Sequence, residues 1–336
     1  MSNNSVFIIA ELSANHNNDF DLAVKTIEAM ADAGADAVKV QTYTADSLAL
    51  DVDNEFFGPK KEGLWKGTRP YDLYQKAAMP YDWQPRLQKI TEELGMTFFS
   101  SPFDFEGVDF LETLDVPLYK IASFEINDIS LIKYVAEKGK PIIISTGVAT
   151  EQDIALAVET CRAAGNEDIT LLKCTSHYPS TLDEANLLTI PDIKQRFKVK
   201  VGVSDHTLGF TVPVVAVSLG AKVIEKHFIL DRSLKGPDSS FSMNPEEFKE
   251  MVDQVRKAER TLGRVTYQVS QADKAKRRSL FAVQNIDKGE AFTKENIRSL
   301  RPGIGLETKY YEQLLGTKSP QKIIKGEPLT KKFLNN

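Results

Sequence analysis

The sequence has few cysteines, no large excess of charge of one sign and no long apolar run. The two cysteines, Cys161 and Cys174, argue against a disulfide framework and favour a reduced, cytoplasmic protein. The net charge of -5 comes from interspersed acidic and basic residues, so neither nucleic acid nor a membrane is an expected partner. No run is apolar enough to span a bilayer, and the N-terminus lacks the positive charge of a secretory signal. An anionic substrate would therefore need local cations.

What the sequence does have is an alternation of short, β-rich apolar runs with longer segments of helical period. Such an alternation predicts parallel strands covered by helices. The predicted strands are Val6–Ala10, Ala37–Val40, Thr97–Ser100, Leu118–Ile121, Pro141–Ile144, Thr170–Lys173, Val199–Val203 and Lys222–Ile224. The predicted helices are Asp21–Ala33, Tyr81–Leu94, Phe105–Leu114, Ile129–Glu137, Glu151–Ala164, Asp183–Gln195, Thr211–Leu219 and Pro245–Leu262.

Eight strand–helix units in about 260 residues are typical of an α/β (β/α)8 TIM barrel, whose functional residues follow the carboxyl ends of the strands. A doubly wound open sheet is the alternative, but it would concentrate polar residues at one switch point. Here they are spread over every predicted strand end, which favours a closed barrel. These residues are Glu11, Lys39, Gln41, Ser101, Lys120, Ser123, Glu125, Ser145, Ser176, Ser204, His206, Glu225 and His227.

Two segments fall outside this repeat. Residues 42–80 are too long for an ordinary loop, and they are interpreted either as a lid or binding loop or as an oligomer contact. Beyond the last predicted helix, a polar stretch precedes short apolar runs divided by Gly and Pro, which indicates a small, mainly β domain. The predicted boundaries are 1–265 for the barrel, 266–278 for a linker and 279–336 for the C-terminal domain.

The lysines at the predicted strand ends have two interpretations. Lys39 shares a strand face with Gln41, and Lys120 lies near Ser123; lysines among hydroxyls suit a phosphate or carboxylate. A buried lysine, with Lys173 as a further candidate, could instead form a Schiff base, as in class I aldolases. Anion binding is favoured, although for each lysine alone a solvated or ion-paired residue is the simplest interpretation.

Two histidines end successive predicted strands. Parallel strands of a βαβ unit bring their carboxyl ends side by side, so His206 and His227 can reach one ion or substrate. Two neutral imidazoles suit a divalent transition metal, whereas a hydrogen-bonded structural histidine is the simpler reading of each one alone. Glu225 shares the inward face of the last strand with His227. Cys174 is assigned to packing.

The whole set of motifs resembles the sialic acid synthase family, whose members condense phosphoenolpyruvate with an N-acetylated aldose. The resemblance covers residues 6–333. It is carried by Ile9-Ala10-Glu11-Leu12-Ser13-Ala14-Asn15-His16, Lys39-Val40-Gln41-Thr42, Tyr119-Lys120-Ile121-Ala122-Ser123, Ser145-Thr146-Gly147, Val203-Ser204-Asp205-His206-Thr207, Glu225-Lys226-His227-Phe228, Gly236-Pro237-Asp238 and Arg301-Pro302-Gly303.

The resemblance implies a TIM barrel followed by an antifreeze-like SAF domain that reaches over the barrel of a dimer partner. His206 and His227 would then hold Mn²⁺ or Mg²⁺, and Arg301 would bind the sugar's N-acetyl group in the partner's site. Phosphoenolpyruvate would be held by Lys39, Lys120, Ser123, Ser145 and Ser204. The sugar, the metal or the attacking water would be faced by Glu11, Gln41, Glu125, Tyr178, Glu225 and Asp238, with Glu11 or Glu225 as the acid or base.

Three departures from the neuraminate motifs indicate the sugar. Ser176 replaces an asparagine, the N-terminal motif differs from Glu-Ile-Gly-Ile-Asn-His, and the run Leu64-Trp65-Lys66-Gly67 is distinctive. All three resemble the pseudaminic acid branch, whose sugar is a 6-deoxy-2,4-diacetamido altrose, and Trp65 would supply apolar contact to it. Neuraminate or legionaminate synthesis is the first alternative. A Schiff-base aldolase or a non-catalytic sugar-binding protein is an alternative of a different class.

Overall fold

The computed structural model describes residues 5–63 and 65–334 of the chain. The chain divides into two compact units, Met1–Gly263 and Arg264–Asn336. A short helix, α11 (Gln271–Ala275), lies in the segment expected to be a linker. Each unit is described here by itself.

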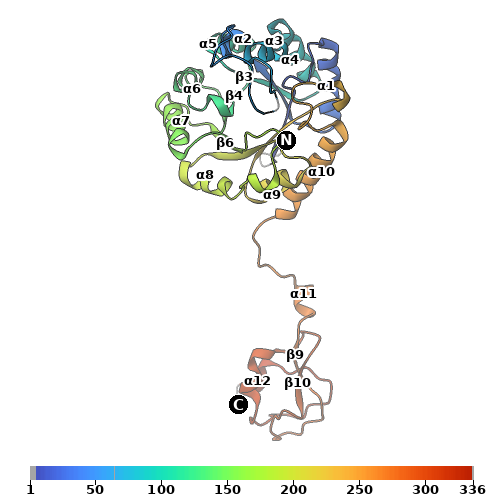
Figure 1. Cartoon of the computed structure of the whole chain (residues 1–336). Coiled ribbons are helices and arrows are strands. Elements are labelled where there is room, and N and C mark those ends of the chain that lie inside the picture. The colour runs from blue at the N-terminus through green and yellow to red at the C-terminus, as the bar shows by residue number, and fades with distance from the viewer. Residues whose placement is uncertain (1–4, 64, 335–336) are drawn as a thin grey trace. The chain divides into compact units, whose positions relative to one another are not determined.

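The first unit is a closed barrel of eight parallel strands with helices around it, as the sequence predicted (Figure 1). The barrel closes where β1 pairs with β8 as well as with β2, so that Glu11 has His227 as its register partner on one side and Lys39 on the other. The strands are β1 (Phe7–Glu11), β2 (Ala37–Thr42), β3 (Thr97–Pro102), β4 (Tyr119–Ile121), β5 (Ile142–Ser145), β6 (Ile169–Cys174), β7 (Lys200–Asp205) and β8 (Val223–His227).

The inward faces of the strands form two layers. Side chains two residues apart share a strand face, and six of the strands contribute first an apolar residue and then a polar residue or cysteine to the interior. The apolar layer includes Ile9, Ala37, Phe99, Ile143, Leu172 and Val223. Two residues further on lie Glu11, Lys39, Ser101, Ser145, Cys174 and Glu225. The barrel interior therefore contains a small apolar layer, followed by a layer of polar and charged side chains at the carboxyl ends of the strands.

The helices pack their apolar faces against the outward faces of the strands, where the largest buried core of the chain lies. Several begin at a residue whose side chain accepts a backbone N–H, such as Asp19, Asp104, Thr150 and Asn244. The helices around the barrel are α1 (Phe20–Asp32), α4 (Gln84–Glu93), α5 (Phe105–Thr113), α6 (Ile129–Ala136), α7 (Glu151–Ala163), α8 (Thr189–Phe197), α9 (Thr211–Ser218) and α10 (Pro245–Leu262).

The prediction of one helix over 183–195 was wrong. Thr181 and Glu184 form a capping box that closes only a 3-10 turn, Leu182–Glu184. Asn186 then adopts a left-handed conformation with φ 45°, and the helix α8 begins at Thr189. An asparagine tolerates this conformation because its short polar side chain bonds locally, so the interruption is local chemistry that helical periodicity does not show.

The long segment after β2 contains two helices that were not predicted, α2 (Ala45–Leu48) and α3 (Pro70–Ala77). Between them, Lys60 and Thr68 are joined by a backbone hydrogen bond, and Arg69 forms ion pairs with Asp51 and Asp72. Trp65 is half-buried, whereas Leu64 of the predicted recognition run lies outside the described residues. The segment is therefore an ordered wall on one side of the barrel mouth.

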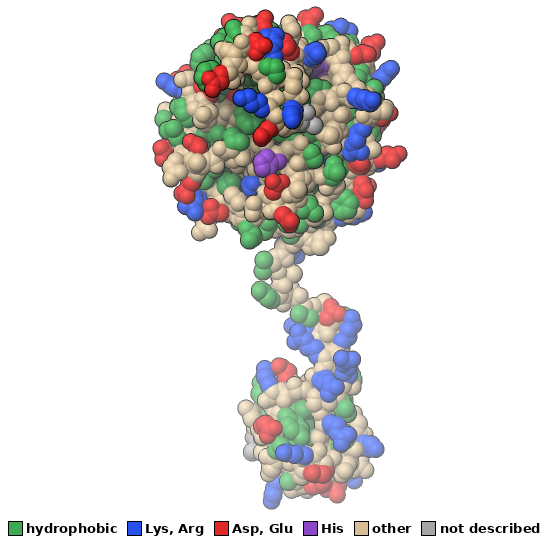
Figure 2. All heavy atoms as spheres, in the orientation of Figure 1, with side chains coloured by type: hydrophobic (Ala, Val, Ile, Leu, Met, Phe, Trp, Pro, Cys, Tyr) green, Lys and Arg blue, Asp and Glu red, His purple; other side chains and the backbone are tan. Residues whose placement is uncertain are grey.

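The second unit is a small antiparallel sheet in the order β10-β9-β11, formed by β9 (Ser279–Ala282), β10 (Ile297–Leu300) and β11 (Leu306–Glu307). The short helix α12 (Tyr311–Leu314) adds Leu314 to an apolar core with Leu280 and Phe292. Arg301 follows β10 and is exposed. Residues 264–336 contain more basic than acidic side chains, and Lys and Arg gather on the visible face of this unit (Figure 2).

The surface of the barrel unit carries interspersed acidic and basic side chains on its visible face (Figure 2). Cys161 and Cys174 are both buried free thiols. Within residues 5–63 and 65–334, no helix combines the length and apolar character needed to cross a membrane.

Candidate active site

A cavity of about 350 Å³ opens at the carboxyl ends of the barrel strands. Its volume is in the range of small-molecule sites. Residues from all eight barrel strands or the loops that follow them reach it, together with residues of the 42–80 segment. The site lies where a TIM barrel places its catalytic groups.

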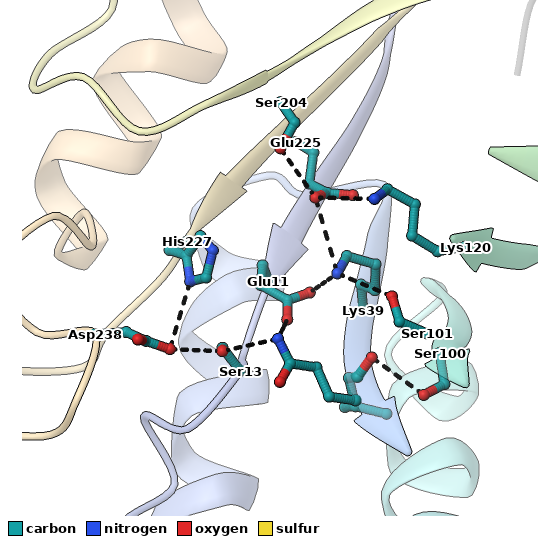
Figure 3. Close-up of polar contacts among 12 residues, drawn as sticks. Glu11, Ser13, Lys39, Ser100, Ser101, Lys120, Ser204, Glu225, His227 and Asp238 are labelled. Carbon is teal, nitrogen blue, oxygen red and sulfur yellow. Dashed lines mark hydrogen bonds and ion pairs between the residues drawn. The ribbon is translucent and has the colours of Figure 1, made fainter. Parts of the chain in front are cut away.

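The floor of the cavity is a cluster of buried lysines and carboxylates (Figure 3). Lys39 Nζ lies 2.6 Å from Glu11 Oε2 and 3.8 Å from Glu225 Oε1. Lys120 Nζ is also 3.8 Å from Glu225 Oε1, so this carboxylate is shared by the two ammonium groups. Ser204 Oγ donates to the same oxygen at 3.1 Å.

Burial and neighbouring charges shift the pKa values of Glu11 and Glu225 in opposite directions. Burial raises the pKa of Glu11 to about 7, and the Glu225 charge adds to the rise although Lys39 opposes it. Burial would also raise the pKa of Glu225, but Lys120 and Lys39 outweigh it and hold this pKa below its usual value. Two nearby carboxylates with separated pKa values suit a proton donor and a proton acceptor.

Burial likewise lowers the pKa of Lys120, against the opposing charge of Glu225. For Lys39, the carboxylates of Glu11 and Glu225 outweigh burial and raise the pKa. The Schiff-base candidate Lys173 does not line this cavity: it lies between the inward-facing Leu172 and Cys174, and its Nζ donates to the Cys174 carbonyl at 2.8 Å. The candidate Lys173 is therefore separated from the other two lysines.

Hydroxyls and a glycine form the side of the floor next to the lysines. Ser145 Oγ is buried and has no hydrogen-bond partner among the described residues. Gly147 N donates to Ser123 Oγ at 3.1 Å. A Cβ on Gly147 would lie 2.1 Å from Ser176 Oγ and 2.9 Å from Ser123 Oγ, so only glycine lets these serines approach the loop. The arrangement offers donors for an anion beside two ammonium groups.

The two predicted histidines meet on the opposite side, with ring centroids 5.3 Å apart. His206 Nδ1 is 3.0 Å from the Thr175 carbonyl, and an N–H donated there leaves Nε2 with the lone pair. His227 Nδ1 is buried without a hydrogen-bond partner in the described part of the chain, and burial, with the charge of His206, lowers the pKa of His227 well below its usual value. Burial would lower the pKa of His206, but the contact with Cys174 outweighs burial and raises it. His227 therefore supplies a neutral imidazole nitrogen, the ligand that a divalent transition metal prefers.

A third protein ligand is not grouped with the histidines: no cluster of three or more His, Cys, Asp or Glu suited to a metal occurs in residues 5–63 and 65–334. Asp238 Oδ2 is nearest, 3.9 Å from His227 Nδ1. A metal bound by two imidazoles would keep its other positions for substrate or water, as a catalytic metal does.

Cys174 was assigned to packing, but its side chain lines the cavity, with Sγ 4.0 Å from His206 Nδ1. Burial would raise the pKa of this thiol, but the contact with His206 outweighs it and lowers the pKa to about 7. The missed signal was strand alternation, since Cys174 lies two residues after the inward-facing Leu172.

The side of the cavity near Asp238 is a chain of polar contacts. Ser13 Oγ donates to Asp238 Oδ2 at 2.6 Å and accepts from Gln41 Nε2 at 3.1 Å. Gln41 Nε2 also donates to Glu11 Oε1 at 3.2 Å. Ser13 was not predicted as a site residue, and the signal for it was its position in the first motif, where the neuraminate motif has glycine.

The outer wall is mainly apolar and includes Leu48, Leu73, Phe103 and Phe124. Trp65 packs against Tyr178 at 6.3 Å between ring centroids, and its buried Nε1 has no hydrogen-bond partner among residues whose structure is described. Lys60 Nζ lies 5.0 Å from the centre of the Trp65 ring. This wall offers apolar contact with one free N–H donor.

Most predicted site residues line this one cavity: Lys39, Gln41, Trp65, Lys120, Ser123, Glu125, Ser145, Tyr178, Ser204, His206, Glu225, His227 and Asp238. Glu11 and Ser101 are buried behind its wall, where both contact Lys39 Nζ. Ser176 Oγ lies 3.8 Å from Cys174 Sγ. Arg301 belongs to the second unit and is not placed with the others. The unpredicted lining residues include Lys60, Tyr43, Tyr74, Phe103 and Phe241, which come from loops or the 42–80 segment.

Comparison with known proteins agrees with this geometry. Residues 26–267 match the NeuB family, and residues 277–335 match the SAF domain. The chain belongs to the NeuB family. It is 47% identical over 327 residues to a pseudaminic acid synthase of Campylobacter jejuni, covering 96% of this chain and 95% of that protein. The barrel-plus-SAF architecture read from the sequence is thereby confirmed.

Two other relatives place the chain within the NeuB family. An N,N'-diacetyllegionaminic acid synthase of Legionella pneumophila is 36% identical, covering 98% of this chain and 94% of that protein. The crystal structure of an N-acetylneuraminic acid synthetase from Leptospira borgpetersenii, in complex with citrate, matches with a TM-score of 0.72 and 33% identity. It covers 81% of this NeuB-family chain and 90% of that structure.

Proposed function

We propose that this NeuB-family chain is a pseudaminic acid synthase, which condenses phosphoenolpyruvate with 2,4-diacetamido-2,4,6-trideoxy-altrose and releases phosphate. The observation that carries the proposal is the near-full-length identity with the Campylobacter jejuni synthase, which exceeds that with the legionaminic acid synthase. The cavity supplies the groups that such a reaction needs.

Phosphoenolpyruvate would bind over the buried lysines. Its phosphate and carboxylate are anions, and Lys39 and Lys120 supply two ammonium groups that are nearly inaccessible to water. The unpartnered Ser145 Oγ, with Ser123 and Ser204, supplies further donors. In a site of low polarity these contacts are stronger than in water.

His206 and His227 would hold a divalent metal, Mn²⁺ or Mg²⁺. Such an ion supplies Lewis-acid polarisation of the C1 aldehyde of the open-chain sugar. The free nitrogen of His227 and the orientation of His206 by the Thr175 carbonyl support these two residues as its ligands. Because Mg²⁺ prefers oxygen ligands, the imidazole pair favours Mn²⁺ of the two.

The reaction would join C3 of phosphoenolpyruvate to C1 of the sugar, add water at C2, and lose phosphate by cleavage of the C–O bond. Protons must move to the new hydroxyl and from the attacking water. Burial raises the pKa of Glu125 to about 7, as it does for Glu11, so both can exchange a proton near neutral pH. Glu225 stays ionised between Lys39 and Lys120 and holds their ammonium groups in position.

The apolar outer wall supports a 6-deoxy sugar with two acetamido groups. The carbons furthest from the aldehyde would meet this wall, where a methyl group needs no hydrogen bond and an acetamido carbonyl could accept from Trp65 Nε1. N-acetylmannosamine has a hydroxymethyl group at its far end and would leave more polar atoms unpaired there.

The test is phosphate release from phosphoenolpyruvate with a panel of sugars. The 2,4-diacetamido altrose should be used well above N-acetylmannosamine and the legionaminic acid precursor, and either of those as the better substrate would overturn the pseudaminate assignment. Borohydride trapping of a covalent adduct with pyruvate, combined with no phosphate release, would instead favour the Schiff-base aldolase.

We further propose that the chain works as a domain-swapped homodimer in the cytoplasm. In this arrangement Arg301 would complete the partner's site, and the basic second unit would meet an acidic barrel unit. Two buried free thiols are compatible with a reducing compartment.

A further inference from the structure

Ser13, in the turn after β1, has a backbone that serine rarely adopts. Its φ of 47° lies in the left-handed region, where an L side chain costs conformational free energy. The other positive-φ residues besides glycine in the described chain are Asn17, Asn18, Asp115, Asn186, Lys198 and Lys235, and none of these lines the cavity. Strain of this kind persists where surrounding contacts hold it, and it clusters at functional sites.

The contacts that hold Ser13 are those of its hydroxyl. Ser13 Oγ donates to Asp238 Oδ2 at 2.6 Å and accepts from Gln41 Nε2 at 3.1 Å, and the side chain is buried. Figure 3 shows the result: Ser13 lies between Asp238, which faces His227, and the amide that contacts Glu11. One hydroxyl thus joins the histidine side of the cavity to the lysine side.

These hydrogen bonds leave one side-chain oxygen of Gln41 and one of Asp238 available to accept a hydrogen bond from a ligand. Both Gln41 and Asp238 line the cavity. Gln41 uses only Nε2 and Asp238 only Oδ2 in side-chain hydrogen bonds, and no partner for Gln41 Oε1 or Asp238 Oδ1 occurs in the part of the chain that the structure describes. Two oriented acceptors match the N–H and O–H donors of an acetamido sugar.

We propose that Ser13 is a positioning residue for the sugar half of the site, which holds Gln41 and Asp238 so that their free oxygens face the bound acetamido sugar. This rests on the proposed function. Among the described residues Ser13 forms no hydrogen bond with Lys39 or Lys120 and reaches the lysine side only through Gln41 and Glu11, so phosphoenolpyruvate binding should depend on it much less than sugar binding does. The strained backbone is kept because a residue without a hydroxyl cannot bridge the two side chains.

Two variants separate the hydroxyl from the backbone. Ser13→Gly removes the hydroxyl and relieves the positive φ, whereas Ser13→Ala removes the hydroxyl and keeps the strain. Both should raise the KM for the sugar about tenfold, with the KM for phosphoenolpyruvate within about twofold of wild type. The melting temperature of Ser13→Gly should exceed that of Ser13→Ala, because only the glycine relieves the strain, so a rise in sugar KM that is equal in the two variants is not loss of folding.

A double-variant comparison tests whether Ser13 acts through its neighbour. In a Gln41→Ala background, Ser13→Gly should raise the sugar KM by clearly less than it does in wild type, because part of what it positions is already absent. Equal effects of Ser13→Gly on the sugar KM in the two backgrounds would show that Ser13 does not act through Gln41.

Sugar binding measured by calorimetry needs no turnover and separates this inference from the proposed reaction. A wild-type chain that binds the 2,4-diacetamido sugar but releases no phosphate would overturn the reaction, and the role of Ser13 would be decided by the Kd of its variants. Wild-type sugar KM or Kd in both Ser13→Gly and Ser13→Ala would overturn the inference alone. A wild-type chain that binds no acetamido sugar would overturn both.

Discussion

Glu11 Oε2 and Lys39 Nζ lie 2.6 Å apart inside the barrel, and the two residues are register partners in β1 and β2. Their side chains are almost fully buried, so each charge has been removed from water. Such a pair adds little net stability, but the loss of one member leaves an uncompensated charge in the core. Glu11 and Lys39 therefore each need the other's charge to remain ionised in the barrel interior.

Lys39→Met should therefore destabilise the barrel by about 3–5 kcal/mol, because Glu11 and Glu225 lose their shared counter-charge. The double variant Lys39→Met with Glu11→Gln should recover part of this loss. Denaturant unfolding measures both, with Lys89→Ala, on an exposed ion pair, as the control that changes stability by less than about 0.5 kcal/mol. Equal losses for Lys39 and Lys89 would contradict the prediction.

Glu125 should make stability depend on pH. Burial raises its pKa from the ordinary 4.5 to about 7 in the folded chain. The folded state thus prefers the protonated acid, so this contribution to stability is fully present below about pH 4.5 and is lost as pH rises through 7.

Because glutamine mimics the protonated acid, Glu125→Gln should gain roughly 2–3 kcal/mol over wild type between pH 4.5 and pH 8. Urea unfolding at the two pH values measures this difference. The exposed Glu159→Gln serves as the control and should follow wild type at both. A constant difference between wild type and Glu125→Gln would show that Glu125 does not titrate differently in the folded state.

The parts of the fold that follow from period and spacing could be predicted from the sequence. Alternation along β8 placed Glu225 and His227 inward together, and both line the cavity. The same rule, applied to Cys174, would have brought that thiol into the site. By contrast, Phe103 and Phe241 reach the cavity from loops, where no periodicity relates sequence position to direction. For Ser13 the first motif marks only a difference from glycine; its role also needed its φ and its two partners, neither of which the sequence displays.

Gly147→Ala should weaken phosphoenolpyruvate binding without unfolding the barrel. The new Cβ would lie 2.1 Å from Ser176 Oγ and 2.9 Å from Ser123 Oγ, so both hydroxyls must turn away from the loop. We expect the KM for phosphoenolpyruvate to rise about tenfold, measured by steady-state kinetics. Adding Ser176→Ala removes the closest contact and should restore part of the affinity for phosphoenolpyruvate. An unchanged KM in the double variant would show that the contact with Ser176 does not cause the loss of affinity.

Removal of metal should abolish phosphate release, and Mn²⁺ should restore it. A readout independent of activity is thermal stability, since an ion that binds only the folded chain at 100 times its Kd stabilises it by about 2.7 kcal/mol. His227→Ala should lose the rise in melting temperature with added Mn²⁺. His177→Ala, at an exposed histidine paired with Glu184, should keep it. The same response in all three proteins would exclude the histidine pair as the metal site.

Arg301 should act in the site of the partner subunit, and mixed dimers can test this. Arg301→Ala and Lys120→Ala should each lose at least 99% of activity alone, by loss of the sugar contact and of the anion contact. In a swapped heterodimer of the two, one site receives both defects and the other receives neither. Random mixing should then restore roughly a quarter of wild-type activity, because half of the dimers are mixed and each has one intact site. If Arg301 served its own barrel, every site in the mixture would contain one defect, and no activity would return.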